Sequence, residues 1–231
     1  MQVIFLIDFD IDDHEVNQMA KLNILLVGPQ GSGKSVQGNL ISQKYSIPRI
    51  STGDILREHI NGDTDLGRLV KPIMDKGELA PEEIVVKMVK ERLSKPDAKN
   101  GYILDGFPRT ISQAKALDTI STISIVVNLD LSDSEALKRI SSRRICSKCG
   151  ATFNIITFSP KDAGICDSCS GTLIQRDDDK ASAVKKRLKT FHESTSPILK
   201  HYGKIVATVD GAKSVESVFN NIVKAIETLR K

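Results

Sequence analysis

A glycine-rich loop at residues 28–35, GPQGSGKS, follows directly after the apolar run LNILLV at residues 22–27. Gly28, Gly33, Lys34 and Ser35 have the spacing of the Walker A pattern. In such a loop the backbone N–H groups turn inward around a phosphate, the following helix N-terminus adds positive potential, and the lysine reaches the β- and γ-phosphates. The sequence therefore predicts a strand at 22–27, a phosphate-binding loop, and a helix that starts near Lys34.

The loop belongs to a wider alternation of short apolar runs and longer helical patterns. The apolar runs lie at 22–27, 101–105, 123–130 and 204–210. This alternation is typical of parallel strands that are connected by helices. We therefore expect an α/β fold, in which a P-loop parallel β-sheet carries helices on both faces.

Two segments interrupt this alternation. Residues 51–80 read as short helices joined by glycine turns, which indicates a helical insertion. Residues 143–179 hold all four cysteines and show little helical periodicity, which favours a small β-rich insertion. The expected division is a core at 21–50, 81–142 and 180–231, the two insertions, and an N-terminal extension at 1–20.

The charge is unevenly distributed along the chain. Residues 1–20 hold five acidic residues and no Lys or Arg, which leaves 33 basic and 24 acidic residues elsewhere, a net charge of +9. Such a basic body suits a polyanionic ligand. No apolar run approaches the roughly 18 residues of a membrane span, and the start lacks the basic residues of a secretory signal, so we expect a cytoplasmic protein without membrane contact. For the extension two readings stay open: Met19 is the true start, or VIFLI adds an edge strand.

Three further motifs extend the argument to a second substrate. They are ISTGDILRE at 50–58, GYILDGFPRTISQAKAL at 101–117 and IQRDDDKASAVKKRL at 174–188. Together with the loop they make the chain, from about residue 21 to its C-terminus, resemble adenylate kinase. The resemblance implies reversible transfer of the γ-phosphoryl group of ATP to AMP, giving two ADP, in purine nucleotide homeostasis. It also implies that residues 51–80 bind the nucleoside monophosphate and that residues 143–179 form a lid.

Arginines are the residues best suited to such a transfer, because their planar guanidinium groups spread positive charge over phosphate oxygens. The candidates are Arg57, Arg109, Arg139, Arg143, Arg176 and Arg187. By the resemblance, Arg57 and Arg109 hold the AMP phosphate, and Arg143 and Lys34 hold the ATP phosphates. Arg176 and Arg187 close onto the transferring group from the lid side. The implied catalytic set is Lys34, Asp105, Arg109, Arg143, Arg176 and Arg187.

The resemblance also assigns the two nucleotide sites. Thr52 and Gln113 match adenine-side positions, and Gln113 offers both a donor and an acceptor. Related pyrimidine monophosphate kinases tend to have Asn near this position, so AMP is the expected acceptor. The implied AMP-binding residues are Thr52, Arg57, Glu78, Leu79, Ala80, Gly106, Phe107, Pro108, Arg109, Gln113, Arg176 and Arg187. The implied ATP-binding residues are Gly31, Ser32, Gly33, Lys34, Ser35, Val36, Arg139, Arg143, Thr152, Phe153 and Lys213.

The loop departs from the family pattern at one point. The family usually reads Gly-Lys-Gly-Thr-Gln, whereas this chain has Ser35 and Val36 after Lys34. Val36 removes a hydroxyl that could contact a phosphate or the magnesium shell, and Ser35 supplies one at the neighbouring position. We hypothesise that Ser35 takes over this role.

Asp105 is the candidate for Mg²⁺, which would accompany ATP. It ends an apolar run at the carboxyl edge of the expected sheet, where α/β proteins bind their ligands. Magnesium keeps several waters and takes few carboxylates, so Asp105 is expected to accept hydrogen bonds from its water shell. Asp54 is a second candidate.

The cysteines form two pairs, Cys146 with Cys149 and Cys166 with Cys169, with sixteen residues between the pairs. Two such pairs can bring four thiolates to one tetrahedral zinc ion, as in a zinc ribbon. A closed four-ligand site leaves no place for a catalytic water. The spacing therefore predicts a structural Zn²⁺ that stabilises a lid too small to hold much core of its own.

Three rival functions remain open. They are a nucleoside monophosphate kinase of another base preference, a zinc-ribbon nucleic-acid-binding P-loop ATPase, and a binding protein weakened in catalysis by Val36. The acceptor-side motifs and the scarcity of aromatic residues for base stacking count against nucleic acid as a partner. The expected partners are ATP, AMP and ADP, and because one chain holds both sites, a monomer suffices.

Overall fold

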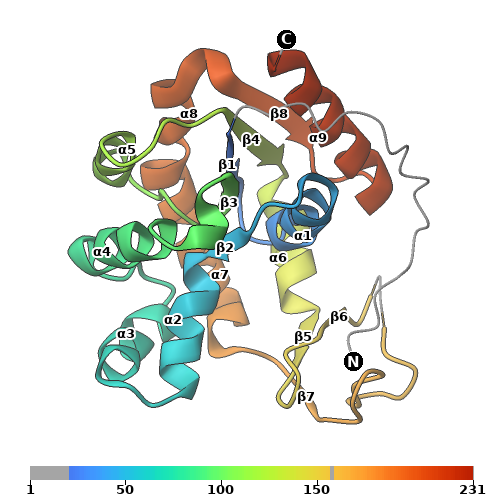
Figure 1. Ribbon diagram of the computed structural model, residues 1–231. Coiled ribbons are helices and arrows are strands. Elements are labelled where there is room, and N and C mark those ends of the chain that lie inside the picture. Colours follow the sequence, from blue (N-terminus) through green and yellow to red (C-terminus); the bar gives the residue numbers. More distant parts are fainter. Residues whose placement is uncertain (1–20, 157–158, 231) are drawn as a thin grey trace.

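The computed structural model describes residues 21–156 and 159–230. The expectations for residues 1–20 lie outside this part of the chain. Among the described residues, five parallel strands form a sheet in the order β2-β3-β1-β4-β8 (Figure 1). Their bounds are Leu22–Val27 (β1), Arg49–Ser51 (β2), Gly101–Asp105 (β3), Ile125–Asp130 (β4) and Val206–Asp210 (β8). The expected parallel sheet is confirmed, although β4 and β8 each start two residues later than the apolar runs predicted.

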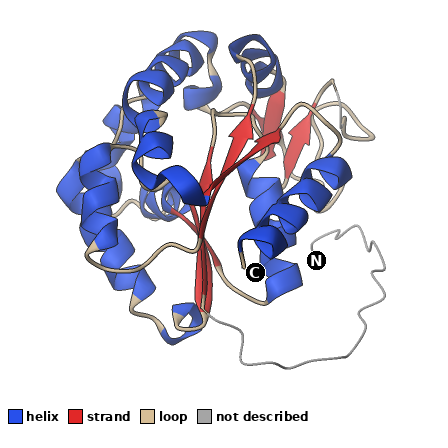
Figure 2. Ribbon diagram, turned by 90° about the horizontal axis from the view of Figure 1, so that it is seen from above, coloured by secondary structure: helices blue, strands red, loops and turns tan. Residues whose placement is uncertain are grey.

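Helices cover both faces of this sheet (Figure 2). Strand β1 is buried along its whole length, and its residues alternate between two cores, with Ile24 in one and Leu25 in the other. The first core packs against α1 (Lys34–Tyr45) and α9 (Val215–Leu229). The second packs against α4 (Glu82–Leu93), α5 (Ile111–Asp118) and α8 (Pro197–Tyr202). This two-sided burial explains why the strands read as continuous apolar runs.

The strand order brings the sequence motifs together at one edge of the sheet. Strand β1 lies between β3 and β4, and Leu26 pairs in register with Asp105. The loop after β1 and the residues after β3 therefore leave the sheet side by side. The chain therefore passes from β1 to β3 on one side and to β4 on the other, and in open α/β sheets ligands bind where the strand order reverses in this way.

Residues 51–80 contain two helices that pack together, α2 (Thr52–Asn61) and α3 (Asp65–Asp75). Each begins with a hydroxyl cap: Ser51 accepts from the Asp54 N–H, and Thr64 accepts from the Gly67 N–H. A Cβ at Gly67 would clash with the His59 carbonyl oxygen, so only glycine allows this close approach of α3 to α2. The expected helical segment is present, but the short strand β2 before it was not predicted.

Residues 143–179 contain a separate antiparallel sheet in the order β6-β5-β7. The strands are β5 (Arg143–Cys146), β6 (Thr152–Asn154) and β7 (Leu173–Ile174). The segment follows α6 (Asp133–Ser141), ends in the short helix η2 (Asp177–Asp179) and is followed by α7 (Ala181–Thr190). The remaining short helical turns are η1 (Pro96–Ala98), η3 (Phe191–Thr195) and η4 (Gly203–Ile205). None of the described helices combines the length and apolar character needed to cross a membrane.

Candidate active site

The glycine-rich loop leads directly into α1. Gly31 and Gly33 have φ angles of 81° and 94°, a backbone region that glycine adopts without strain. Lys34 folds back over the loop, and its Nζ donates to the carbonyl oxygens of Gly28 (2.7 Å) and Pro29 (2.8 Å). The loop conformation and the start of α1 together suit the binding of a phosphate group.

Lys34 lies in a setting that disfavours its positive charge. Burial has the largest effect and lowers its pKa to about 8. Asp105 opposes this shift, while Arg109, Arg187 and Arg143 add to it. A lysine surrounded by three arginines indicates a place built for an anion.

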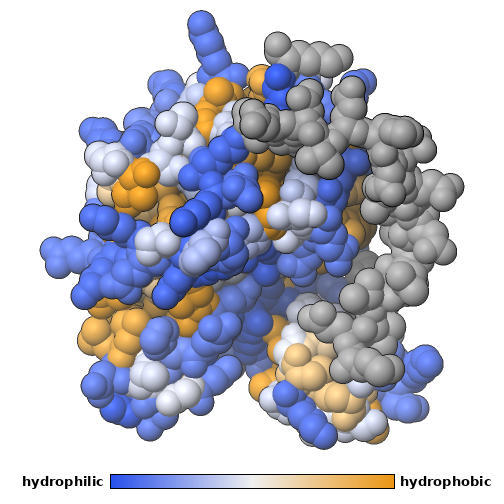
Figure 3. Space-filling view, in the orientation of Figure 1, coloured by the Kyte–Doolittle hydropathy of each residue, from blue (hydrophilic) through white to orange (hydrophobic). Residues whose placement is uncertain are grey.

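The arginines themselves are crowded in the same way. Burial lowers the pKa of Arg187 and of Arg176 to about 10, and in each case neighbouring arginines add to the effect. Burial also lowers the pKa of Arg109, and Arg57 repels it. The space-filling view shows a hollow with hydrophilic walls between the lobe of α2 and α3 and the lobe of residues 143–179 (Figure 3). Positive groups from separate segments of the chain thus converge on one region.

Two aspartates after β7 hold these arginines in place. The fully buried Asp179 accepts from Arg143 Nε (2.9 Å) and Nη2 (2.5 Å), and it lies 3.7 Å from Arg187. Asp178 accepts from Arg187 Nη1 at 3.0 Å. Because hydrogen bonds from a guanidinium to a carboxylate fix the plane of the guanidinium, these contacts orient Arg143 and Arg187.

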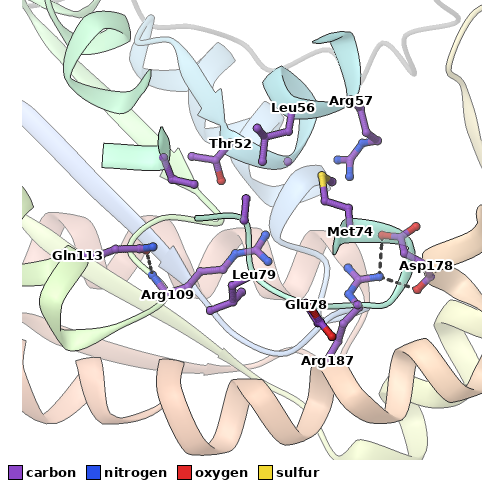
Figure 4. A pocket seen from close by; sticks show the side chains of 14 residues that line it. Thr52, Leu56, Arg57, Met74, Glu78, Leu79, Arg109, Gln113, Asp178 and Arg187 are labelled. Carbon is purple, nitrogen blue, oxygen red and sulfur yellow. Dashed lines mark hydrogen bonds and ion pairs between the residues drawn. The ribbon is translucent and has the colours of Figure 1, made fainter. Parts of the chain in front are cut away.

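A cavity opens beside this cluster, between α2, α3 and the segment after β3 (Figure 4). One part of its wall is apolar, with Leu56, Met74 and Val85, and another part carries Arg109 and Arg187. Gln113 is 3% exposed, and its Oε1 accepts from the Arg109 N–H at 2.8 Å. The cavity therefore combines an apolar wall with a basic wall, which suits a base joined to a phosphate.

The four cysteines converge within the small antiparallel sheet. Their Sγ atoms all lie within 4.8 Å of one another, with 3.4 Å between Cys146 and Cys169 and 3.6 Å between Cys149 and Cys166. Four sulfurs around zinc at about 2.3 Å stand about 3.8 Å apart, so this tetrad fits a tetrahedral zinc ion. Cys146 and Cys166 are buried with Phe153 and Leu173 in a small core of this sheet.

Comparison with known proteins decides which family has this arrangement. The sequence model of the family described as adenylate kinase matches residues 26–207. The chain belongs to the adenylate kinase family. It is 46% identical over 212 residues to an adenylate kinase of Methanothrix thermoacetophila, a match that covers 89% of this chain and 98% of that relative. It is 44% identical over 216 residues to the adenylate kinase of Archaeoglobus fulgidus, covering 90% and 100% of the two chains. An adenylate kinase of Treponema denticola is 47% identical over 199 residues, covering 85% and 95%.

Membership of the adenylate kinase family makes the chain an enzyme that transfers phosphoryl groups between adenine nucleotides. Many of the residues expected at its AMP site share the cavity described above. Those that line it are Thr52, Arg57, Glu78, Leu79, Ala80, Arg109, Gln113 and Arg187. Gly106 lies next to the cavity, since its carbonyl oxygen accepts from Thr52 Oγ1 (2.9 Å) and Arg109 Nε (2.8 Å). Phe107 is 1% exposed and packs in the second core, and neither it nor Pro108 nor Arg176 lines the cavity.

The residues expected at the ATP site of this adenylate kinase do not share one cavity. Arg139 donates to the carbonyl oxygens of Gly31 (3.4 Å) and Gly211 (2.9 Å), and so connects the phosphate loop to the turn before α9. Thr152, Lys213 and Val36 are exposed, with Val36 at 49%. Phe153 is 3% exposed and belongs to the core beside the cysteines.

One residue near the phosphate loop was missed by the sequence reasoning. Arg49, in β2, donates to Asp105 Oδ2 from Nη2 (2.7 Å) and Nε (3.1 Å), and to Asp54 Oδ2 from Nη2 (3.0 Å). Burial lowers its pKa, but the two carboxylates outweigh this effect and the net shift is upward. No sequence signal pointed to Arg49, because its place beside the expected carboxylate follows from the pairing of Ser51 with Asp105, which only the structure shows.

Proposed function

We propose that this adenylate kinase transfers the γ-phosphoryl group of ATP to AMP in a reversible, magnesium-dependent reaction that gives two ADP. The observation that carries the proposal is the convergence of Lys34, Arg109 and Arg187. Lys34 belongs to the phosphate loop, Arg109 and Arg187 line the cavity with an apolar and a basic wall, and both arginines influence the charge of Lys34. Two anion-binding sites that face one set of positive charges suit a transfer between two nucleotides.

The residues have separate roles in this scheme. Lys34 and Arg143 hold the ATP phosphates, and Arg57 and Arg109 hold the AMP phosphate so that one of its oxygens attacks the γ-phosphorus in line. The new P–O bond forms as the bond to the oxygen shared with the β-phosphate breaks. Arg176 and Arg187 spread the charge of the transferring group.

Magnesium fits this site, because Asp105 and Asp54 offer oxygen ligands beside the loop and Ser35 Oγ lies 3.0 Å from Asp105 Oδ2. When bound with ATP, the ion would neutralise charge on the phosphate oxygens. We expect Asp105 to receive hydrogen bonds from its water shell. The cysteine tetrad likewise fits Zn²⁺ in a purely structural role.

AMP is the favoured acceptor. The Gln113 Oε1 is engaged by the Arg109 N–H, so the Gln113 NH₂ group is the part that can donate to a base. Adenine N1 accepts a hydrogen bond, whereas guanine carries a donor at that position. We further propose that residues 51–80 close over AMP, that residues 143–179 close over ATP, and that a single chain carries out this reaction of purine nucleotide homeostasis in the cytoplasm.

The proposal is tested by mixing the protein with MgATP and AMP, CMP, UMP, GMP or no acceptor, and following diphosphate formation by phosphorus NMR. We expect ADP from both substrates with AMP alone. Transfer to another monophosphate would overturn the role of Gln113, and hydrolysis without an acceptor would overturn the proposal.

A matched pair of arginine variants separates a role in catalysis from a general effect of charge. Arg109→Gln should lower kcat about 100-fold or more, because a charged donor that holds the AMP phosphate in line for attack is lost. Arg144→Gln is the control, since Arg144 donates from Nη1 to the carbonyl oxygens of Ser141 and Arg143 and lies outside the cavity.

A further inference from the structure

Arg49 bridges two carboxylates of the site. Its side chain is 14% exposed, and that of Asp105 is 7% exposed. A single nitrogen, Nη2, lies 2.7 Å from Asp105 Oδ2 and 3.0 Å from Asp54 Oδ2. Two carboxylate oxygens that share one donor this closely would repel each other strongly if the arginine were absent.

Within the described part of the chain, the side-chain donors to Asp105 all contact one of its oxygens. Oδ2 accepts from Arg49 Nη2 (2.7 Å), from Arg49 Nε (3.1 Å) and from Ser35 Oγ (3.0 Å). A carboxylate oxygen has about two lone-pair positions, so Oδ2 is fully used. The arrangement fixes the plane of the Asp105 carboxylate and leaves Oδ1 as the oxygen for any further partner.

The position of the Arg49 guanidinium, between two carboxylates, also suits a free divalent cation. Two carboxylates and a hydroxyl are hard oxygen donors of the kind that Mg²⁺ and Mn²⁺ prefer. The guanidinium supplies the positive charge that such an ion would bring. Asp54 also accepts from Arg57 Nη2 at 2.5 Å, so both of these acids are paired with arginine in the nucleotide-free protein.

We propose that Arg49 is a positioning residue that orients Asp105 and keeps free divalent cations out of the nucleotide-free site, so that magnesium enters together with the nucleotide. The second half of this inference rests on the proposed function. The first half concerns the protein without nucleotide and is tested without any measurement of activity.

The test is the binding of Mn²⁺ to nucleotide-free protein, followed by the electron paramagnetic resonance signal of the free ion. We expect Arg49→Gln to bind Mn²⁺ at least about tenfold more tightly than the unchanged protein, because two carboxylates lose their counter-charge. Arg49→Lys keeps the charge and should restore exclusion. Adding Asp105→Asn to Arg49→Gln should abolish the new Mn²⁺ binding. This result would show that the ion binds at Asp105.

Controls separate this effect from net charge and from unfolding. Arg68→Gln removes the same charge from an exposed ion pair with Asp63 and Asp65 and should leave Mn²⁺ binding unchanged. Circular dichroism checks each fold, and Arg49→Met replaces Arg49→Gln if the latter does not fold. The inference is overturned if the unchanged protein binds Mn²⁺ as tightly as the variant, or if Arg68→Gln gains binding equally.

A second readout connects the inference to turnover. In Arg49→Gln, Mg²⁺ in excess over ATP should inhibit phosphoryl transfer, whereas in Arg49→Lys and the unchanged protein it should not. Lack of any transfer activity in the unchanged protein would count against the proposed function alone, since the Mn²⁺ result stands independently of it. If excess Mg²⁺ inhibited Arg49→Gln, Arg49→Lys and the unchanged protein equally, the proposal that magnesium enters together with the nucleotide would be overturned.

Discussion

At the scale of the residue, the lowered pKa of Lys34 predicts how activity depends on pH. Only the protonated amine attracts phosphate, and its pKa in the nucleotide-free protein is about 8. We therefore expect kcat/KM for ATP to be level below pH 8 and to fall as the pH rises through 8. Bound phosphate favours the charged form, so kcat should hold to higher pH.

Steady-state kinetics across pH 6–10 check this prediction, with Lys34→Arg as the comparison. Arginine keeps its charge throughout, so the variant should be slower but lack the fall near pH 8. A profile for the unchanged protein that stays level to pH 10 would contradict the assignment. Between pH 8 and 10.5 Lys34 binds more protons in the unfolded chain than in the folded one, so its own contribution to the free energy of unfolding rises with pH in that interval.

Ser35 and Val36 predict a second outcome at this scale. Ser35 Oγ donates to Asp105 Oδ2 at 3.0 Å, while the Val36 side chain is 49% exposed. Ser35→Ala should lower kcat about tenfold, which corresponds to the loss of one hydrogen bond to a charged group, and should raise the magnesium concentration for half-maximal rate. Val36→Thr should change kcat less than about threefold. Unchanged turnover and unchanged magnesium dependence in Ser35→Ala would rule out the hypothesis that Ser35 replaces the hydroxyl missing at Val36.

At the scale of the element, we expect the small antiparallel sheet to depend on the proposed zinc ion. Its core consists of few residues, among them Phe153 and Leu173, so the proposed zinc should contribute much of its stability. Removing zinc with a chelator should unfold residues 143–179 while the parallel sheet stays folded. Hydrogen exchange should show early loss of protection in β5–β7 alone, and Cys149→Ser should reproduce the effect and respond no further to chelator. A single melting transition, shifted as a whole, would contradict separate unfolding.

The elements that could be predicted from the sequence are those with a repeating reason for burial. Strands β1 and β3 match their apolar runs because each is buried on both faces. Strand β2 was missed because it has three residues and starts with Arg49, whose side chain serves an ion pair instead of a core. Strand β4 starts late because the Asn23 N–H donates to Ser124 Oγ and the Thr122 carbonyl oxygen accepts from the Asn23 side chain, which replaces the next bond of the ladder.

Only those residues of the candidate site that lie within sequence motifs could be predicted. Lys34, Asp105 and the cysteines lie within recognisable spacings, so their residue types already indicated their chemistry. The bond between Gln113 and the Arg109 backbone, the burial of Phe153, and the hold of Asp179 on Arg143 depend on contacts between segments brought together by folding. No local pattern encodes such contacts.

At the scale of the whole molecule, the converging positive charges predict that anions stabilise the fold. Lys34, Arg176 and Arg187 all have pKa values lowered by burial, with neighbouring arginines adding to the effect, so their positive charges are disfavoured unless an anion is bound. Inorganic tripolyphosphate at 100 times its Kd should raise Tm by about 5–10 °C. Arg187→Gln should reduce the shift. Sodium chloride at equal ionic strength is the control, and an equal rise with it would contradict a specific anion site.

The pairing of β5 with β7 has a consequence for how chains of this kind can change. Cys146 lies opposite Leu173 and Ile145 opposite Ile174, so the segment between them leaves and returns at neighbouring positions. A deletion between these strands could be closed by a short turn without rerouting the path from α6 to α7. The metal-binding unit is therefore modular: one genetic event could lengthen, shorten or exchange it while the parallel sheet and the phosphate loop keep their order.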